Sequence, residues 1–177
     1  MTDEHLIVEA RRGSREAFEA LFDRYRRPIW QFFRRRTAAA ARAEELAQDT
    51  FVALLEGAHR YQGRTVFRAY LFGIAYHVLG AHRRKAAHRH TDPLDFDPPS
   101  DSSRDPDAAL WVRRALARLD ADDREILMLR EYDELSYQEI ADVRHIPLNT
   151  VRSQLFRARL ALQAALVPAD DQVRVKR

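Results

Sequence analysis

The side chains best suited to bind a ligand lie near the C-terminal end, on one side of an expected helix over 148–162. Four of them project away from an apolar stripe and a fifth flanks it: Asn149, Ser153, Phe156, Arg157 and Arg152. Arginine hydrogen-bonds guanine edges and phosphates, and small polar side chains fit beside it in a DNA major groove. A basic outer face also suits an ordinary solvated helix. Phe156 is the residue that favours DNA binding over a solvated face, because an exposed aromatic ring is poorly explained by solvation. Its ring either contacts DNA or packs on a neighbouring helix.

Two helices joined by a short turn position this face. Ser136 and Glu139 have the S-x-x-E spacing of a capping box, which predicts a helix starting at about Tyr137. Residues 145–147 break that helix. The second helix has apolar residues at three- and four-residue steps: Leu148, Val151, Leu155, Ala158, Leu162 and Leu166. The pattern predicts a helix-turn-helix whose second helix can enter a major groove.

A second informative stretch covers residues 59–90. Tyr61 lies in a short loop, and Thr65 can cap the helix that follows. Gly73 and Gly80 each cost about 1 kcal/mol relative to alanine inside a helix. Close packing on another helix, which we favour, or room for a nucleotide would justify that cost. His77, between them, is either a partly buried core histidine or a polar contact. The helix ends in a basic run from His82 to His90.

Three nearby histidines, His82, His88 and His90, suggest a metal site. No carboxylate or cysteine completes a ligand pattern, and the interleaved arginines would repel a cation. We therefore expect no metal and no cofactor. The sequence also has no phosphate-binding glycine loop, nucleophile motif or paired-carboxylate site, so no enzyme activity is expected.

Two ordered strings resemble a known family. LSYQEIA (135–141) followed by TVRSQLFRARLAL (150–162) is similar to the C-terminal helix-turn-helix of bacterial RNA polymerase sigma factors of the extracytoplasmic-function (ECF) group, in the sigma-70 family. RYQGRTVFRAYLFGIA (60–75) resembles their second region. His145 and Asn149 replace frequent glycines, and Gln154 replaces a common arginine. Histidine tolerates left-handed backbone, so we expect the turn to survive.

The resemblance implies three sets of contact residues. The duplex minus-thirty-five element would be read by Asn149, Arg152, Ser153, Phe156 and Arg157. The single-stranded minus-ten element would be held by Tyr61, Arg64, Thr65, His77, Arg83 and Arg84. Core polymerase, through the clamp of its largest subunit, would face Glu45, Gln48 and Asp49. His77 stands where some family members have a base-contacting asparagine, and a surface or capping role would also explain Gln48 and Asp49.

Charge divides the chain into parts. The net charge of +3 is spread as +7 over residues 1–90, −5 over 91–107 and +1 over 108–177. A basic part is an electrostatic footprint for nucleic acid. We expect an all-α fold with two small helical domains, 1–90 and 107–168, a flexible acidic linker at 91–106 and a charged tail at 169–177. The linker is either a tether or, as the resemblance implies, threads into polymerase channels.

Within the first part, apolar residues at helical spacing predict a mainly aromatic core. Pro28 should kink or interrupt its second helix. Arginines 34–36 follow, near the negative end of that helix, and are expected to form a solvated cap. The sequence has no bilayer-length apolar run, no signal-peptide core and no cysteine, so we expect a cytoplasmic protein without membrane insertion or disulfides.

The resemblance therefore predicts a sigma factor that binds core RNA polymerase and directs promoter recognition, DNA opening and transcription initiation. It also implies an anti-sigma factor as partner. The alternative is a stand-alone helix-turn-helix regulator, which would bind DNA as a symmetric dimer. No segment resembles a dimerisation helix, so we expect a monomer when the protein is free of partners.

Overall fold

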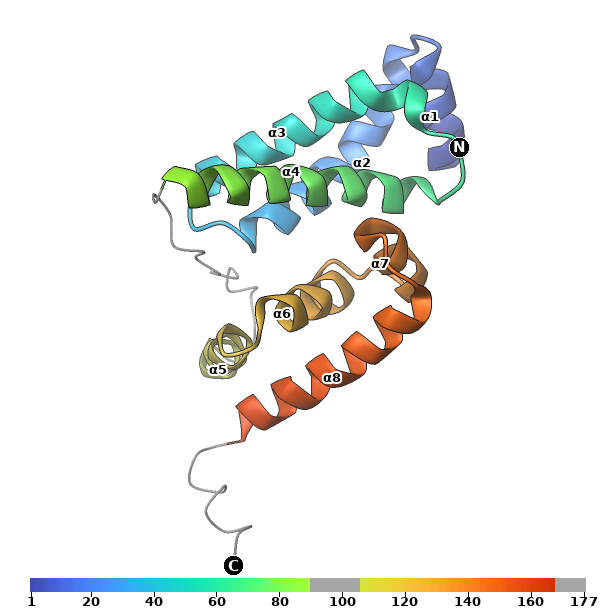
Figure 1. Ribbon diagram of the computed structural model, residues 1–177. Coiled ribbons are helices and arrows are strands. Elements are labelled where there is room, and N and C mark those ends of the chain that lie inside the picture. Colours follow the sequence, from blue (N-terminus) through green and yellow to red (C-terminus); the bar gives the residue numbers. More distant parts are fainter. Residues whose placement is uncertain (90–105, 168–177) are drawn as a thin grey trace, which may run out of the picture.

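The computed structural model describes residues 1–89 and 106–167, and every regular element within them is a helix (Figure 1). The N-terminal half contains α1 (Asp3–Arg11), α2 (Arg15–Arg34), α3 (Ala40–Gly57), the short η1 (Ala58–Arg60) and α4 (Phe67–Arg89). The C-terminal half contains α5 (Pro106–Ala117), α6 (Ala121–Leu127), the π-helix η2 (Met128–Tyr132), α7 (Tyr137–Arg144) and α8 (Leu148–Leu166). The expected tail lies outside these ranges, as does the linker apart from Pro106.

The N-terminal half is a bundle around an aromatic core. Phe32, Phe33, Phe67 and Phe72 are fully buried. The ring of Phe32 meets those of Phe33 and Phe72 edge to face, and the ring of Phe67 meets those of Tyr25 and Tyr61 in the same way. Of the two effects expected of Pro28, a kink or an interruption of α2, the interruption is wrong, because one helix runs through the proline. The buried face continues on both sides of the proline, and this packing outweighs the loss of one backbone donor.

The first turn of α4 is capped from a distant part of the chain. The backbone N–H of Phe67 donates to a carboxylate oxygen of Glu4 in α1, at 3.2 Å. Thr65 was expected to cap this helix, but α4 begins at Phe67 and Val66 holds the N-cap position; the backbone carbonyl oxygen of Thr65 accepts from the hydroxyl of Tyr61, at 2.9 Å. A carboxylate at a helix N-terminus also complements the helix dipole. Helix α1 therefore sets where α4 begins.

The predicted helix-turn-helix is confirmed as local structure. The side chain of Ser136 accepts from the backbone of Glu139, and the carboxylate of Glu139 accepts from the backbone of Ser136, which completes the capping box. His145 ends α7 in the left-handed region, at φ 53°. Because histidine tolerates this conformation, the turn forms without the family's glycine.

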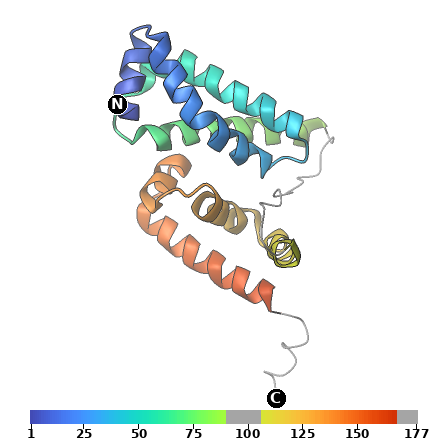
Figure 2. The same ribbon diagram turned by 180° about the vertical axis from the view of Figure 1, so that it is seen from behind.

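The two halves pack against each other, with α7 beside α4 (Figures 1 and 2). At the centre of the interface, Arg36, just past the end of α2, donates to Glu125 of α6 at 2.8 Å and to Asp133 at 2.7 Å. The side chains of Arg36 and Asp133 are each 1% exposed. Arg35 lies beside them, 3.3 Å from Asp133. The expected solvated cap is therefore wrong for Arg35 and Arg36.

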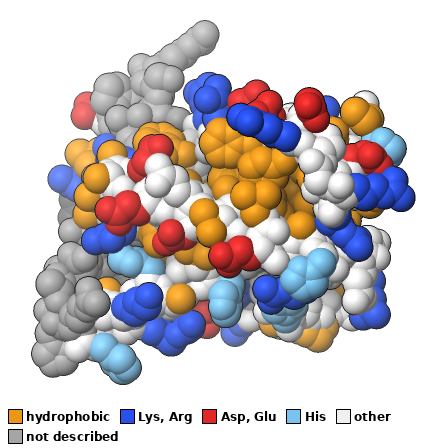
Figure 3. All heavy atoms as spheres, turned by 90° about the horizontal axis from the view of Figure 1, so that it is seen from above, with side chains coloured by type: hydrophobic (Ala, Val, Ile, Leu, Met, Phe, Trp, Pro, Cys, Tyr) orange, Lys and Arg blue, Asp and Glu red, His pale blue; other side chains and the backbone are white. Residues whose placement is uncertain are grey.

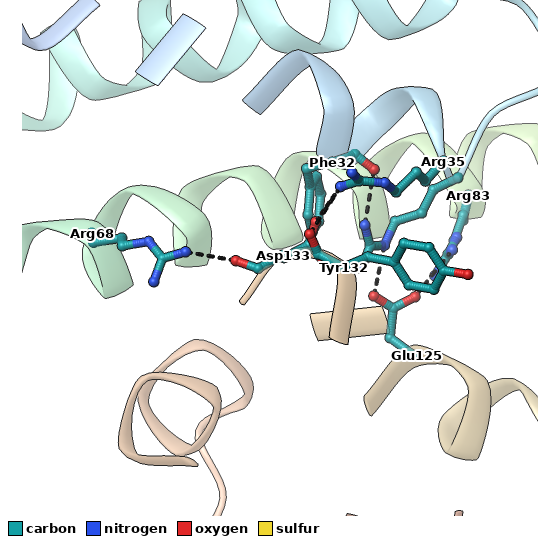
Figure 4. A network of polar contacts seen from close by, with 8 residues as sticks. Phe32, Arg35, Arg68, Arg83, Glu125, Tyr132 and Asp133 are labelled. Carbon is teal, nitrogen blue, oxygen red and sulfur yellow. Dashed lines mark hydrogen bonds and ion pairs between the residues drawn. The ribbon is translucent and has the colours of Figure 1, made fainter. Parts of the chain in front are cut away.

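Arg68 and Arg83, both in α4, continue the contact on either side of this centre. Arg68 donates to the backbone carbonyl of Asp133 at 2.6 Å and lies 3.5 Å from the carboxylate of Glu139. Arg83 lies 3.5 Å from Glu125. Figure 4 shows Arg68 directed toward Asp133 and Arg83 directed toward Glu125. The interface thus adds several arginine contacts to a buried apolar cluster that includes residues of both halves.

Charge pairing offsets the cost of burying these groups. Burial by itself would raise the pKa of Glu125, but the charges of Arg36 and Arg83 outweigh it and hold that pKa below its ordinary value. Burial would lower the pKa of Arg36, and the charges of Asp133 and Glu125 raise it instead. Removing one partner of such a buried pair typically costs about 3–5 kcal/mol.

Acid should remove the stabilisation that Glu125 provides. Because its pKa is lowered in the folded protein, its charge stabilises the structure above the ordinary carboxyl value of about 4.3, and that stability is lost as pH falls through the lowered pKa. Glu125→Gln should lower the free energy of unfolding by about 3 kcal/mol at pH 7. As pH falls below about 4.3 and through the lowered pKa of Glu125, the difference between the variant and the wild type should shrink, because a protonated Glu125 is neutral like glutamine.

Denaturant unfolding of both proteins across this pH range measures the difference. Glu131→Gln, which removes an exposed carboxylate paired with Arg159, is the matched control and should change stability by less than about 1 kcal/mol. A constant difference between wild type and Glu125→Gln from pH 7 to pH 3 would contradict the assigned role of this carboxylate.

Candidate nucleic-acid interface

Helix α8 presents the five predicted reading residues to solvent. Its apolar stripe packs inward, with Val151, Leu155 and Ala158 fully buried. Phe156 points the other way and is 64% exposed. The alternative that Phe156 packs on a neighbouring helix is therefore wrong for this structure. A large exposed ring on a basic helix face indicates a contact surface rather than a solvated face.

Two of the polar residues around Phe156 are joined by a hydrogen bond. Asn149, Arg152, Ser153 and Arg157 are all exposed. The guanidinium of Arg152 donates to the side-chain oxygen of Asn149 at 3.0 Å, which links the two across one turn. This arrangement sets a guanidinium and an amide side by side, and both groups can hydrogen-bond base edges in a major groove.

Gln154 has a structural role that its position in the sequence did not indicate. Its side-chain oxygen accepts from Arg144 of α7 at 3.1 Å, and Arg144 also donates to Asp122 of α6 at 3.1 Å. The glutamine thus connects three helices behind the reading face. Only the packing of α7 on α8 brings these groups together, so spacing within α8 could not have predicted it.

One face of α4 carries exposed polar groups with unusually little side-chain bulk. His77 is exposed, so the alternative of a partly buried core histidine is wrong. A Cβ atom built at Gly73 would meet nothing within 4 Å, and one at Gly80 would meet only Arg84, at 3.5 Å. The favoured reading, that these glycines pack closely on another helix, is therefore wrong. The space beside His77 is open, as the nucleotide alternative requires.

The loop before α4 divides its predicted contact residues between core and surface. Tyr61 is 4% exposed and packs on Phe67 and Tyr70. Burial raises the pKa of its hydroxyl. In this conformation the ring of Tyr61 is not free to stack on a base, and it supports the loop instead. Arg64 is exposed, and Thr65 is half-buried.

A groove between α3 and α4 joins two of the predicted sets. It has a volume of about 470 Å³ and is lined by residues that include Glu45, Asp49, His77, His82 and Lys85. The predicted polymerase contacts Glu45 and Asp49 thus share one groove with the predicted base contact His77. Arg83 faces the C-terminal half and Arg84 is exposed at the end of α4, so the basic helix end points in two directions.

A second groove, between α2 and α3, was missed in the sequence. It has a volume of about 420 Å³, and Phe22, Trp30, Phe51 and Gln48 contribute to its lining. Figure 3 shows hydrophobic side chains gathered in one patch on the face seen from above. Val52 and Leu55 of α3 are also exposed. The sequence did contain a signal for exposed apolar residues on α3, namely the adjacent apolar pairs at 51–52 and 54–55. Neighbouring residues lie about 100° apart around a helix, so the four side chains cannot all face one core.

The histidines do not gather into a metal site in the part of the chain that the structure describes. No group of three or more His, Cys, Asp or Glu side chains there could hold a metal ion. His82 lines the groove between α3 and α4 and His88 is exposed, while His90 lies outside the described residues. Within residues 1–89 and 106–167, no helix combines the length and the apolar character needed to cross a membrane.

Two family descriptions match the chain, one in each half. Sigma-70 region 2 matches residues 21–89. Sigma-70 region 4 matches residues 109–162, which include the helix-turn-helix. Together these matches support the predicted all-α fold with two helical domains.

Curated proteins and a solved structure resemble nearly the whole chain. The RNA polymerase sigma factor YlaC of Bacillus subtilis is 31% identical over 170 residues, which is 91% of this chain and 98% of that protein. The ECF RNA polymerase sigma factor SigC of Mycobacterium tuberculosis is 31% identical, with 93% and 91% of the two chains covered. The structure of CnrH in complex with the cytosolic domain of CnrY has a TM-score of 0.70 at 26% identity, and covers 93% of this chain and 96% of CnrH.

Truncating Phe156 should leave the fold intact. Because the ring is mostly exposed, Phe156→Ala should change the free energy of unfolding by less than about 0.5 kcal/mol. The matched control is its neighbour, since Leu155→Ala empties a buried position and should cost about 2–5 kcal/mol. Chemical denaturation of both variants tests this. A loss above about 2 kcal/mol for Phe156→Ala would mean that the ring is part of the core.

Proposed function

The chain belongs to the ECF group of RNA polymerase sigma factors in the sigma-70 family, with regions 2 and 4, and from this membership we propose which of its surfaces perform each task. Sigma factors bind core RNA polymerase, and this one directs the polymerase in promoter recognition. It is not an enzyme. Family membership also decides against a stand-alone regulator. What remains to be assigned is the role of individual residues and the extent of each domain.

We propose that the outward face of α8 reads the minus-thirty-five element as duplex DNA. The single observation that carries this assignment is the exposed ring of Phe156 set among Asn149, Arg152, Ser153 and Arg157 on a helix whose opposite stripe is buried. Arg152 and Arg157 reach phosphates or guanine edges, and Phe156 packs on a thymine methyl or a sugar. Asn149 restrains Arg152 before DNA arrives, so less side-chain entropy is lost on binding.

The glycine-flanked face of α4 is proposed to hold the minus-ten element as single strand. His77 hydrogen-bonds the edge of an unstacked base, with the side-chain-free backbone at Gly73 and Gly80 leaving room for the nucleotide. Arg64 and Arg84 contact the strand's phosphates. Thr65 contributes by holding the shape of the loop, because its carbonyl oxygen accepts from the hydroxyl of Tyr61, which supports the loop from the core. A neutral histidine presents one donor and one acceptor on opposite ring nitrogens, so its base preference differs from that of an amide.

Core polymerase is proposed to bind α3 through two adjoining surfaces. Glu45 and Asp49 supply polar contacts on the side of α3 that faces α4. The groove that contains Phe22 and Trp30 supplies apolar area on the side that faces α2, and Gln48 in its lining supplies a polar contact there. An apolar centre with a polar rim is the usual composition of a stable protein interface.

The remaining assignments concern the protein's state and partners. We propose domains at 1–90 and 107–168, a cytoplasmic location and a monomeric free form. A partner that blocks polymerase binding, of the anti-sigma class, is proposed from the family and from the similar chain CnrH, which was solved bound to the cytosolic domain of CnrY. Such a partner would cover the exposed apolar groove between α2 and α3.

The reading role of Arg152 can be tested with reconstituted transcription. Start sites mapped on a genomic DNA pool with core polymerase and this protein define its promoters. Arg152→Ala should lower initiation about 5- to 150-fold, because a bidentate base contact contributes about 1–3 kcal/mol. The loss should fall on a single base position of the minus-thirty-five element.

Arg159→Ala is the matched control. Arg159 is also an exposed arginine of α8, but it donates to Glu131 and Tyr137 within the C-terminal half. It should leave promoter preference unchanged. An equal loss of initiation on all sequences by Arg152→Ala, with a shallower salt dependence, would show that Arg152 contacts phosphate and not a base.

The polymerase contact can be tested by co-elution with core enzyme. Gln48→Ala combined with Asp49→Lys should weaken core binding at least about 10-fold, because a reversed charge opposes a complementary surface. The melting temperature should stay unchanged, since both residues are exposed. Glu19→Lys is the control: it reverses a charge on α2 that is paired with Arg15 at 2.8 Å. Normal co-elution of the double variant would exclude this side of α3 as the binding surface.

A further inference from the structure

Gln154 lies at one edge of the outward face of α8. At about 100° per residue it stands about 200° from Arg152 around the helix, with Ser153 midway between them. Ser153 and Arg152 are exposed, and Gln154 is half-buried. A helix in a major groove has one DNA strand on each side, so residues at both of its edges face DNA. Gln154 therefore occupies on one edge of α8 the place that Arg152 occupies on the other.

Arg144 of α7 determines the orientation of the Gln154 amide. Because a guanidinium carries donors only, the atom that it meets at 3.1 Å is the amide oxygen of Gln154 and not the nitrogen. The other terminal nitrogen of Arg144 donates to Asp122 at 3.1 Å, and the Arg144 side chain is only 11% exposed. Held between two acceptors, the guanidinium cannot follow the amide if the amide turns over. The amide is therefore fixed with its oxygen toward α7.

The amide nitrogen of Gln154 is left as an unused donor. Within residues 1–89 and 106–167 this nitrogen has no hydrogen-bond partner, and it is not one of the buried polar atoms that lack one, so it is accessible to solvent. The oxygen and the nitrogen diverge from the amide carbon, so the nitrogen points away from Arg144. An unrestrained glutamine both donates and accepts, and it reads adenine in this way through N7 and N6. Gln154 presents only its donor.

We propose that Gln154 is a further DNA-contacting residue of α8, which donates to a hydrogen-bond acceptor of the minus-thirty-five element, and that Arg144 is the positioning residue that sets this polarity. The inference rests on the proposed reading of that element by α8. The acceptor is either a phosphate oxygen or an acceptor on a base edge. Guanine, adenine and thymine each present such an acceptor in the major groove, whereas cytosine presents an amino donor. A base contact by Gln154 therefore selects against cytosine.

Gln154→Glu distinguishes a DNA contact from a tie between helices. Glutamate keeps an oxygen for Arg144 and pairs with its charge, so the melting temperature should not fall. It also puts a charged oxygen where the donor was, and a DNA acceptor repels that oxygen, so initiation should fall at least about 10-fold. Gln154→Met removes the donor without adding charge and should lower initiation about 2- to 10-fold, the value for one lost hydrogen bond. Gln163→Glu, which adds the same charge at an exposed site near the end of α8, is the control and should change initiation by less than about 2-fold.

Initiation is measured with core polymerase and the full chain, on a promoter found by start-site mapping in which each minus-thirty-five position is changed to all four bases. If the acceptor is on a base, the loss in Gln154→Met should fall on one position, where the wild type discriminates against cytosine and the variant does not. If the acceptor is a phosphate, the loss should be equal on all templates, with an unchanged salt dependence because a neutral amide releases no counterion. Initiation by Gln154→Met and Gln154→Glu equal to that of Gln163→Glu on every template would overturn the proposal.

Arg144→Met tests the positioning role, because it releases the amide and leaves Gln154 in place. The freed amide turns its donor to DNA only part of the time, so initiation should fall, but less than in Gln154→Met. At a base contact it can also turn its oxygen to cytosine, so discrimination against cytosine should weaken. Arg144→Lys keeps a donor for the amide oxygen and should retain the wild-type base profile. Wild-type initiation and base profile in Arg144→Met would overturn this role. A failure of the proposed function is a different result, since the wild-type protein would then give no promoter-specific start sites.

Discussion

The burial of one guanidinium group determines how this protein is assembled. Arg36 lies between Glu125 and Asp133 with almost no contact with water. These charges can be withdrawn from solvent because Arg36 pairs with both carboxylates and Arg35 and Arg83 add further positive charge beside them. The arginine comes from the end of α2 and the carboxylates from either side of η2, so the pairing fixes one half against the other. The placement of α7 on α4, and of Arg68 and Arg83 on either side, follows from this contact.

The closed arrangement leaves the surfaces assigned to DNA and polymerase largely open. The interface uses the side of α4 that carries Arg68 and Arg83, while His77 and the two glycines lie on an exposed side. On α8 the outward face is turned away from the core stripe and remains in solvent. Closure therefore restricts the distance between the two reading surfaces and does not cover them. A protein held in this way keeps each contact surface intact and limits only their simultaneous use.

Local rules predicted local structure, and failed where the partner is distant in sequence. The capping box at Ser136, the left-handed turn at His145 and the buried stripe of α8 each depend on residues within one or two turns, and all were predicted correctly. Arg36 was misjudged because its carboxylates are 89 and 97 residues away. The residue that caps α4 was missed for the same reason, since Glu4 is 63 residues from Phe67. Charge alone cannot distinguish a solvated arginine from one whose partner arrives by tertiary packing.

The hydrogen bond between Glu4 and the first residue of α4 predicts where mutations that change promoter specificity can occur. Asp3, beside it, accepts a hydrogen bond from the hydroxyl of Tyr25 and pairs with Arg24, so the first turn of the chain is joined to two other helices. The loop that carries Arg64 ends at α4, whose first residue is held by Glu4. Substitutions in the first few residues can therefore shift that loop and, through the proposed contact of Arg64 with DNA, alter promoter choice without touching DNA themselves. In a screen for changed specificity, such alleles would map far from the nucleic acid, and an affinity tag fused at this end would act in the same way.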